Sequence, residues 1–217
     1  MHALRSDASL APSPRLVLGS TSPYRRELLA RLGQPFDVAS PEVDEHPLPA
    51  EAPLQTALRL ATLKARAVAA RCPDDAVVIG SDQVADLDGM ILGKPGDHAR
   101  AKAQLQAMRG QTVRFHTAVC VKRATTGFEQ TQVSTVSVRF RALSDEAIDT
   151  YLRLEQPYDC AGSAKCEGLG IVLLERIDSD DPTALVGLPL ILTTGLLQGA
   201  GLDVLAQLGR LAQPCQT

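Results

Sequence analysis

The sequence contains no tryptophan, and its three tyrosines and four phenylalanines make up only 3% of the 217 residues. Proteins that bind single-stranded nucleic acid stack the bases on aromatic side chains, so this composition argues against that function. An excess of positive charge is also absent, because 22 Lys and Arg stand against 25 Asp and Glu, a formal net charge of −3. We therefore expect no nucleic-acid polymer as a partner, although net charge does not exclude a local anion site.

Several motifs that would identify a site directly are missing. The five cysteines are scattered without a CxxC pair, which disfavours a zinc site or a disulfide framework and favours reduced thiols in a cytoplasmic protein. Residues 1–14 lack the apolar stretch of a secretory signal, and we expect a disordered tail there. No GxSxG, HExxH or strand-linked GxGxxG occurs, the four histidines do not cluster at metal-ligand spacing, and His116 is expected to be structural.

One long segment, residues 183–202, carries no charge over a length that could span a membrane. The segment contains Pro189, four glycines and three threonines, and acidic residues precede it without a nearby Lys or Arg. Neither the hydropathy nor the charge pattern fits a membrane span. We expect a buried loop followed by a helix, and no membrane partner.

The hydrophobic pattern predicts an α/β fold, a single mixed-sheet domain with flanking helices over residues 15–208, followed by a tail at 209–217. Apolar runs bounded by turn residues predict strands at 15–19, 36–40, 76–80 and 171–177. Alternating segments at 112–122 and 129–140 predict an antiparallel pair, and Asp88-Gly89 predicts a hairpin turn. Helical spacing, with Ser22, Asp97 and Ser144 as N-caps of the first, third and fourth, predicts helices at 23–32, 54–71, 98–109, 145–154 and within 188–208.

Candidate chemistry lies at the ends of two expected strands, because ligands in open α/β sheets bind beyond the carboxyl ends of strands. The first strand leads through Ser20 into a helix N-terminus with Arg25 and Arg26 in its first turn. Cations are unfavourable there, so a bound anion would explain them, while a plain capped helix with surface arginines remains the alternative. The third strand ends just before Asp82, whose carboxylate either caps a backbone group or takes part in chemistry.

Three further charged positions have simple structural alternatives when taken singly. Lys64 lies at the edge of the apolar face of helix 54–71, where a lysine can extend its ammonium to solvent. Lys94 lies in a Gly-Lys-Pro loop, and Asp44-Glu45 lie in an acidic loop, so both can be solvated. Together, several cations and two or three carboxylates are what a metal–polyphosphate site requires.

These charged residues fall within a series of motifs that occurs in one order along the chain. The motifs are Ser20-Thr21-Ser22-Pro23-x-Arg25-Arg26, Glu42-Val43-Asp44-Glu45, Leu60-Ala61-x-x-Lys64-Ala65, Ile79-Gly80-Ser81-Asp82-Gln83, Gly93-Lys94-Pro95, Ala161-Gly162-Ser163 with Glu167-Gly168, and Val186-Gly187-Leu188-Pro189. In these motifs the sequence resembles the Maf family of nucleotide pyrophosphatases. The resemblance implies the Maf/inosine-triphosphatase-like fold and hydrolysis of a nucleoside triphosphate to the monophosphate and pyrophosphate.

The resemblance also implies roles for individual residues. Asp82 would be the proton acceptor that activates water for attack on the α-phosphorus, and Asp44 and Asp82 would contact a divalent metal cation, Mg²⁺ or Mn²⁺. The phosphates of a small-molecule nucleotide would be held by Ser20, Arg25, Arg26, Lys64 and Lys94. Such a reaction depends mainly on positioning and on neutralising the charge of the leaving pyrophosphate.

Tyr24, Gln83 and Glu167 are implied to determine which base is accepted. Relatives resembling dTTP/UTP hydrolases carry Arg, Thr and Gln at these positions, and this sequence instead resembles the branch acting on 7-methyl-GTP. A methylated guanine carries positive charge, so the Tyr24 ring can stack on it, a contact worth about 1–2 kcal/mol when desolvated. The Glu167 carboxylate can accept hydrogen bonds from guanine N1–H and the amino group.

Two other functions stay open at this stage. A nucleotide-binding regulator of cell division or septum formation without significant catalysis would bind nucleotide but release no pyrophosphate. A sugar-nucleotide transferase would need an acceptor site, for which the sequence offers no pattern. A homodimer is also left open.

Overall fold

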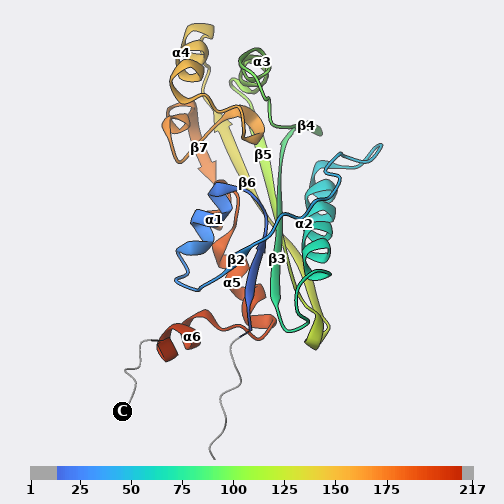
Figure 1. Cartoon of the computed structure of the whole chain (residues 1–217). Coiled ribbons are helices and arrows are strands. Elements are labelled where there is room, and N and C mark those ends of the chain that lie inside the picture. Colours follow the sequence, from blue (N-terminus) through green and yellow to red (C-terminus); the bar gives the residue numbers. More distant parts are fainter. Residues whose placement is uncertain (1–13, 212–217) are drawn as a thin grey trace, which may run out of the picture.

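The computed structural model describes residues 14–211 and is built around one mixed β-sheet with strand order β2-β1-β3-β5-β6-β7, to which β4 adds by pairing with β3 (Figure 1). β1 runs parallel to β2 and β3, and all other pairs are antiparallel. The strands are β1 (Leu16–Gly19), β2 (Asp37–Val38), β3 (Val77–Leu87), β4 (Met90–Leu92), β5 (Thr112–Arg123), β6 (Phe128–Phe140) and β7 (Leu174–Asp178). The predicted α/β class with a mixed sheet and flanking helices is confirmed.

Six α-helices are present within residues 14–211, close to the predicted positions: α1 (Pro23–Ala30), α2 (Pro53–Ala69), α3 (His98–Met108), α4 (Asp145–Glu155), α5 (Leu190–Gly199) and α6 (Val204–Leu211). The predicted caps are confirmed, because the side chains of Ser22, Asp97 and Ser144 each accept a hydrogen bond from a backbone N–H in the first turn of α1, α3 and α4. Helix α6 continues past the boundary predicted at 208. Residues 1–13 and 212–217, and with them most of the expected tails, lie outside the described residues.

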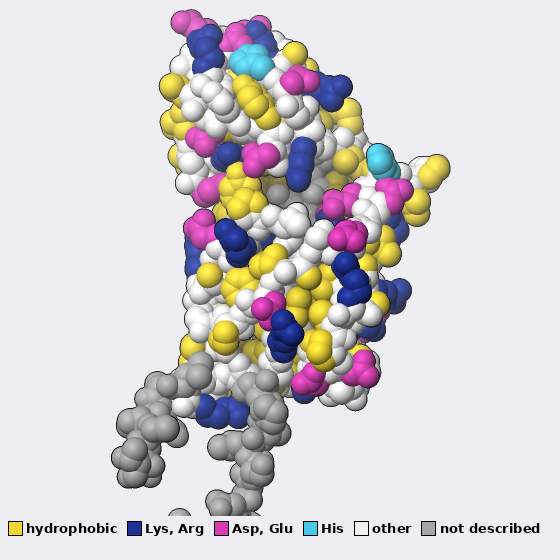
Figure 2. Space-filling model, viewed as in Figure 1, with side chains coloured by type: hydrophobic (Ala, Val, Ile, Leu, Met, Phe, Trp, Pro, Cys, Tyr) yellow, Lys and Arg dark blue, Asp and Glu magenta, His cyan; other side chains and the backbone are white. Residues whose placement is uncertain are grey.

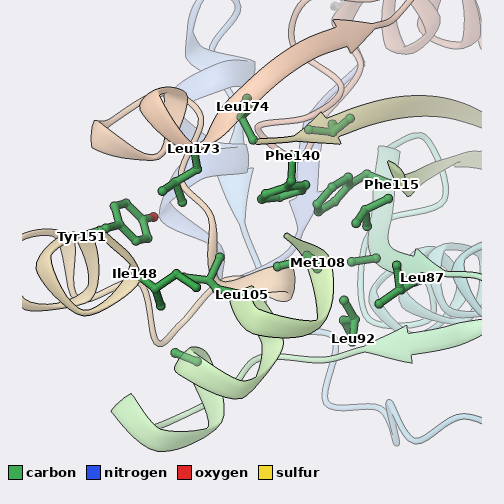
Figure 3. Close-up of a cluster of buried hydrophobic side chains, with 14 of the residues drawn as sticks. Leu87, Leu92, Leu105, Met108, Phe115, Phe140, Ile148, Tyr151, Leu173 and Leu174 are labelled. Carbon is green, nitrogen blue, oxygen red and sulfur yellow. The ribbon is translucent and has the colours of Figure 1, made fainter. Parts of the chain in front are cut away.

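Two hydrophobic cores lie along one face of the sheet. One is formed by β1, α1 and α5 with the first half of β3, where Val77 and Ile79 are buried. The other is formed by β4, α3, α4 and β7 with the last part of β3, and Figure 3 shows its packing around Phe140 and Phe115. Helix α2 covers the opposite face of the sheet. The middle of β3, residues 81–84, therefore lies between the two cores.

The same segment of β3 lacks a neighbouring strand on one edge. β1 pairs with β3 only as far as Gly80, and β4 begins to pair with it at Ala85. On the other edge β5 pairs with β3 continuously from Val77 to Asp86. The sheet is thus open on one side of residues 81–84, and the chain leaves β1 and β4 on either side of this gap.

The predicted strand end at residue 80 is wrong, because β3 continues to Leu87 and Asp82 lies inside it. Pairing with β5 keeps the polar residues extended, which the apolar run alone did not indicate. The predicted hairpin turn is confirmed: Asp88 and Gly89 connect β3 to β4 with φ values of 49° and 89°, the positive values that a tight hairpin turn requires.

Other expectations concern the cysteines, His116 and the uncharged segment. The described cysteines, Cys72, Cys120, Cys160 and Cys166, are free thiols as expected, and Cys215 lies outside the described residues. His116 is buried, and its ring nitrogens lie 2.9 Å from Thr135 Oγ1 and 3.3 Å from Asp86 Oδ2, which agrees with a structural role. In residues 14–211 no single helix is long and apolar enough to cross a membrane; α5 and α6 together meet that criterion but are bent by 77° between them.

Candidate active site

A cleft of about 760 Å³ opens at the gap in the sheet. Figure 2 shows this side of the molecule, hollowed between the part that carries α3 and α4 and the part that carries α1 and α2, with side chains of both charges at the border. Eight of the ten residues predicted for the site line the cleft: Ser20, Tyr24, Arg25, Lys64, Asp82, Gln83, Lys94 and Glu167. Arg26 and Asp44 do not.

The centre of the cleft is a charge cluster on the α2 side of the sheet, in which a buried ion pair contacts an exposed carboxylate. Lys64 Nζ donates to Asp82 Oδ1 at 2.8 Å and lies 2.9 Å from Glu45 Oε2. Lys64 and Asp82 are only 4% and 6% exposed, which excludes the solvent-extended lysine considered above. Burial raises the pKa of Asp82, while the positive charges of Lys64 and Arg25 oppose that rise. The result is a carboxylate with increased basicity that Lys64 holds by a hydrogen bond and that the positive charge of Arg25 also stabilises.

Glu45, and not Asp44, is the carboxylate that reaches this cluster. The Asp44 side chain is exposed and binds within its own turn, where Oδ1 accepts from His46 N at 3.0 Å. Nothing in the local sequence distinguishes Glu45 from Asp44; the loop's path over α2 decides it.

Arg25 and Ser20 lie next to this cluster and bring a guanidinium and a hydroxyl, groups that can bind an anion, to the cleft. Arg25 Nη1 donates to Ser20 Oγ at 3.5 Å, and Arg25 Nε donates to the Gly187 carbonyl oxygen at 2.8 Å. Burial lowers the pKa of Arg25, opposed by the charges of Asp82 and Glu45. The helix turns about 100° per residue, so Arg26, one position on, is exposed and does not line the cleft.

Asp82 and Gln83 face opposite sides of the sheet, as adjacent residues in a strand must. Gln83 Nε2 lies 2.9 Å from Thr117 Oγ1 on β5, and it reaches the 183–188 segment, where the carbonyl oxygens of Ala184 and Leu185 lie at 3.1 and 3.0 Å. Because Nε2 is engaged by the chain itself, Gln83 can offer only its Oε1 acceptor to a ligand. This link also fixes the segment that carries Gly187.

The remaining predicted residues lie around the rim of the cleft. Lys94 is exposed in the loop that follows β4, on the side of the gap opposite Ser20. Glu167 is exposed in the segment between α4 and β7, and Tyr24 projects from the start of α1. A residue not predicted for the site, Asp159, also lines the cleft and accepts a hydrogen bond from Tyr24.

The loop that carries Glu45 is held by Glu51, whose carboxylate binds Arg59 Nε at 2.6 Å and accepts from Leu48 N and Thr56 Oγ1. The hydrogen bonds from Arg59 lower the pKa of Glu51 from 4.5 to about 2. A carboxyl group whose pKa is lowered on folding stabilises the protein above the unfolded pKa, and this contribution is lost as the pH falls toward the folded value.

Glu51→Gln is therefore expected to lower the melting temperature at pH 7 and to reduce the loss of stability between pH 4.5 and pH 2. Thermal unfolding followed by circular dichroism at a series of pH values measures both effects. Glu175→Gln is the control, because Glu175 is exposed and its Oε2 lies as far as 4.0 Å from Arg139 Nε. A surface ion pair of this kind contributes little to the free energy of unfolding. If the melting temperature depended on pH in the same way in Glu51→Gln and in the unchanged protein, this role of Glu51 would be contradicted.

The model of the Maf-like protein family matches the sequence over residues 15–200, which include the cleft and every strand described above. The chain belongs to the Maf-like protein family. Curated relatives cover nearly its whole length. It is 65% identical over 202 residues to a 7-methyl-GTP pyrophosphatase of Polaromonas sp., an alignment covering 93% of this chain and 92% of the relative.

Two further relatives carry the same name. This Maf-like chain is 64% identical to a 7-methyl-GTP pyrophosphatase of Albidiferax ferrireducens, covering 88% of the chain and 96% of the relative. It is 63% identical to a 7-methyl-GTP pyrophosphatase of Burkholderia pseudomallei, and the alignment covers 87% of this chain and 88% of the relative. A solved nucleoside-triphosphatase / dITP/XTP pyrophosphatase from Mycobacterium abscessus is 18% identical with a TM-score of 0.39, covering 59% of this chain and 75% of that one.

Proposed function

We propose that this Maf-like protein is a nucleoside triphosphate pyrophosphatase that hydrolyses 7-methyl-GTP to 7-methyl-GMP and pyrophosphate. The observation that carries the proposal is the buried ion pair of Asp82 and Lys64, with Glu45 and Arg25 beside it, in an open cleft. Burying an ion pair adds little to stability, because the cost of desolvation offsets the attraction, so such a pair in a cleft indicates a functional site. A carboxylate beside several cations suits phosphate hydrolysis. Relatives more than 60% identical, named 7-methyl-GTP pyrophosphatase, support the substrate.

In the proposed reaction the residues divide into two sets. Asp82 accepts the proton of the attacking water, and Lys64 holds the Asp82 carboxylate in position and contributes positive charge beside the phosphates. Arg25, Ser20 and the N-terminus of α1 bind phosphate oxygens from one side of the gap, and Lys94 binds them from the other. Charge stabilisation of the leaving pyrophosphate is the larger part of catalysis in such reactions.

A divalent cation fits this site together with the substrate. Within residues 14–211 no group of three or more His, Cys, Asp and Glu side chains could hold a metal ion by itself. However, Asp82 Oδ1 and Glu45 Oε2 lie 2.8 and 2.9 Å from the same atom, Lys64 Nζ, so two carboxylates stand close together in the cleft. Mg²⁺ is commonly bound by one or two carboxylates together with substrate phosphates, which matches this pair. When bound, the ion would neutralise charge on the phosphates.

The substrate is tested by measuring pyrophosphate release from 7-methyl-GTP, GTP, dTTP and UTP with Mg²⁺ or Mn²⁺. We expect kcat/KM to be highest for 7-methyl-GTP, because Tyr24 offers a ring to a cationic base and Glu167 accepts from guanine donors. Equal turnover of dTTP or UTP would contradict the proposed substrate. Tight nucleotide binding without pyrophosphate release would instead support the non-catalytic regulator.

A further inference from the structure

Three side chains form a contact at the mouth of the cleft that no role in phosphate chemistry explains. Tyr24 Oη donates to Asp159 Oδ2 at 3.1 Å, although the two residues are 135 positions apart. Lys165 Nζ lies 5.7 Å from the centroid of the Tyr24 ring and 3.5 Å from Asp159 Oδ1. The contact joins the start of α1 to the segment between α4 and β7.

The ring of Tyr24 thus already interacts with one cation in the free protein. The Lys165 side chain is 18% exposed, while Asp159 is 59% exposed. Burial by itself would lower the pKa of Lys165, but the Tyr24 hydroxyl and the Asp159 carboxylate raise it above its ordinary value, so the ammonium stays charged. A lysine within about 6 Å of an aromatic ring is attracted by its negative face.

This arrangement acts on a second cation that approaches the same ring. A positively charged base stacking on the face that Lys165 occupies must displace the ammonium. On the opposite face, the base meets an ammonium across the ring and is repelled by it. In both cases Lys165 opposes a cationic base. Asp159 favours the binding of a cationic base, because its carboxylate partly neutralises the charge of Lys165 and itself lines the cleft.

We propose that Asp159 and Lys165 are specificity-determining residues that set, with opposite signs, how strongly the Tyr24 ring binds a positively charged base. The inference rests on the proposed function, since it takes the base of 7-methyl-GTP as the cation. A neutral guanine of nearly the same shape, in GTP, does not feel these charges in the same way. The pair therefore adjusts the preference for 7-methyl-GTP over GTP.

The test compares two single variants and their combination. Lys165→Met keeps the length of the side chain without its charge and is expected to raise the ratio of kcat/KM for 7-methyl-GTP over GTP by about fivefold, the size of one exposed cation–π contact. Asp159→Asn is expected to lower the same ratio by about fivefold. In the double variant this ratio of kcat/KM values is expected to lie between those of the two single variants. Because these residues do not touch the reacting phosphates, the changes should appear in KM and not in kcat.

Matched controls come from another Lys–Asp pair outside the cleft. Lys102 Nζ lies 2.7 Å from Asp149 Oδ2 between α3 and α4, and neither residue lines the cleft. Lys102→Met and Asp149→Asn remove the same charges and should leave the ratio unchanged. Lys165→Arg, which retains the charge, should also keep the ratio of the unchanged protein.

Equilibrium binding of the products 7-methyl-GMP and GMP separates this inference from the proposed function. If the unchanged protein releases no pyrophosphate from 7-methyl-GTP, the proposed function fails. If it does, and the ratio of the dissociation constant of GMP to that of 7-methyl-GMP rises in Lys165→Met and falls in Asp159→Asn, the inference is supported. A fall of the ratio in Lys165→Met, as expected of a lysine that binds the base directly, or no shift in either variant, would overturn it.

Discussion

Asp82→Asn is expected to reduce the rate of pyrophosphate release from 7-methyl-GTP by roughly 10³-fold, the size of a general-base contribution. Asparagine has the shape of aspartate, and its Oδ1 can still accept the hydrogen bond from Lys64. It cannot take a proton from water at neutral pH, and it removes the negative charge that Lys64 and Arg25 now face. Steady-state release of pyrophosphate, with circular dichroism to verify folding, measures the effect.

A second buried aspartate on the same strand provides the control for Asp82→Asn. Asp86 lies four residues further along β3, on the same face, and is 4% exposed. It accepts from Gly89 N and lies within 3.3 Å of His116 Nε2, and it does not line the cleft. Asp86→Asn should lower stability but retain turnover per folded molecule. More than a tenth of the original rate in Asp82→Asn would exclude Asp82 as the base.

Gly80→Ala is expected to lower the free energy of unfolding by about 3 kcal/mol or more, at the upper end of the cost of overpacking. A Cβ atom at Gly80 would lie 2.3 Å from the Ala61 carbonyl oxygen and 2.4 Å from Ala65 N. Both are backbone atoms of α2 and cannot rotate away, so the helix must move off the sheet. For a protein of this size the melting temperature should fall by about 6–12 °C.

The same displacement should also reduce activity. Lys64 lies on α2 between Ala61 and Ala65, and its 2.8 Å contact with Asp82 depends on the close approach of α2 to β3. Gly195→Ala, inside α5, is the control, because a Cβ there meets nothing within 4 Å. It should leave stability unchanged or raise it by up to about 1 kcal/mol through helix propensity. Equal melting temperatures for Gly80→Ala and Gly195→Ala would show that α2 adapts to the added methyl group.

Local features of the sequence determined most of the secondary structure. Ser22, Asp97 and Ser144 marked the first turns of three helices, and Asp88-Gly89 marked the hairpin, because caps and tight turns depend on hydrogen bonds and φ values within a few residues. The motif series indicated the family, and the family match over residues 15–200 confirms it. The roles given to individual site residues stay predictions for the variants above to test.

The tertiary structure alone decided how the site is assembled. The cleft exists because β1 stops pairing at Gly80 and β4 starts at Ala85, and strand pairing between distant segments leaves no local mark in the sequence. The same holds for Glu45 reaching Lys64 in place of Asp44, and for the contact of Tyr24 with Asp159. In each case a residue's chemistry was visible in the sequence. Which residue faces the cleft depends on how loops and helices pack across the sheet, which only the folded chain specifies.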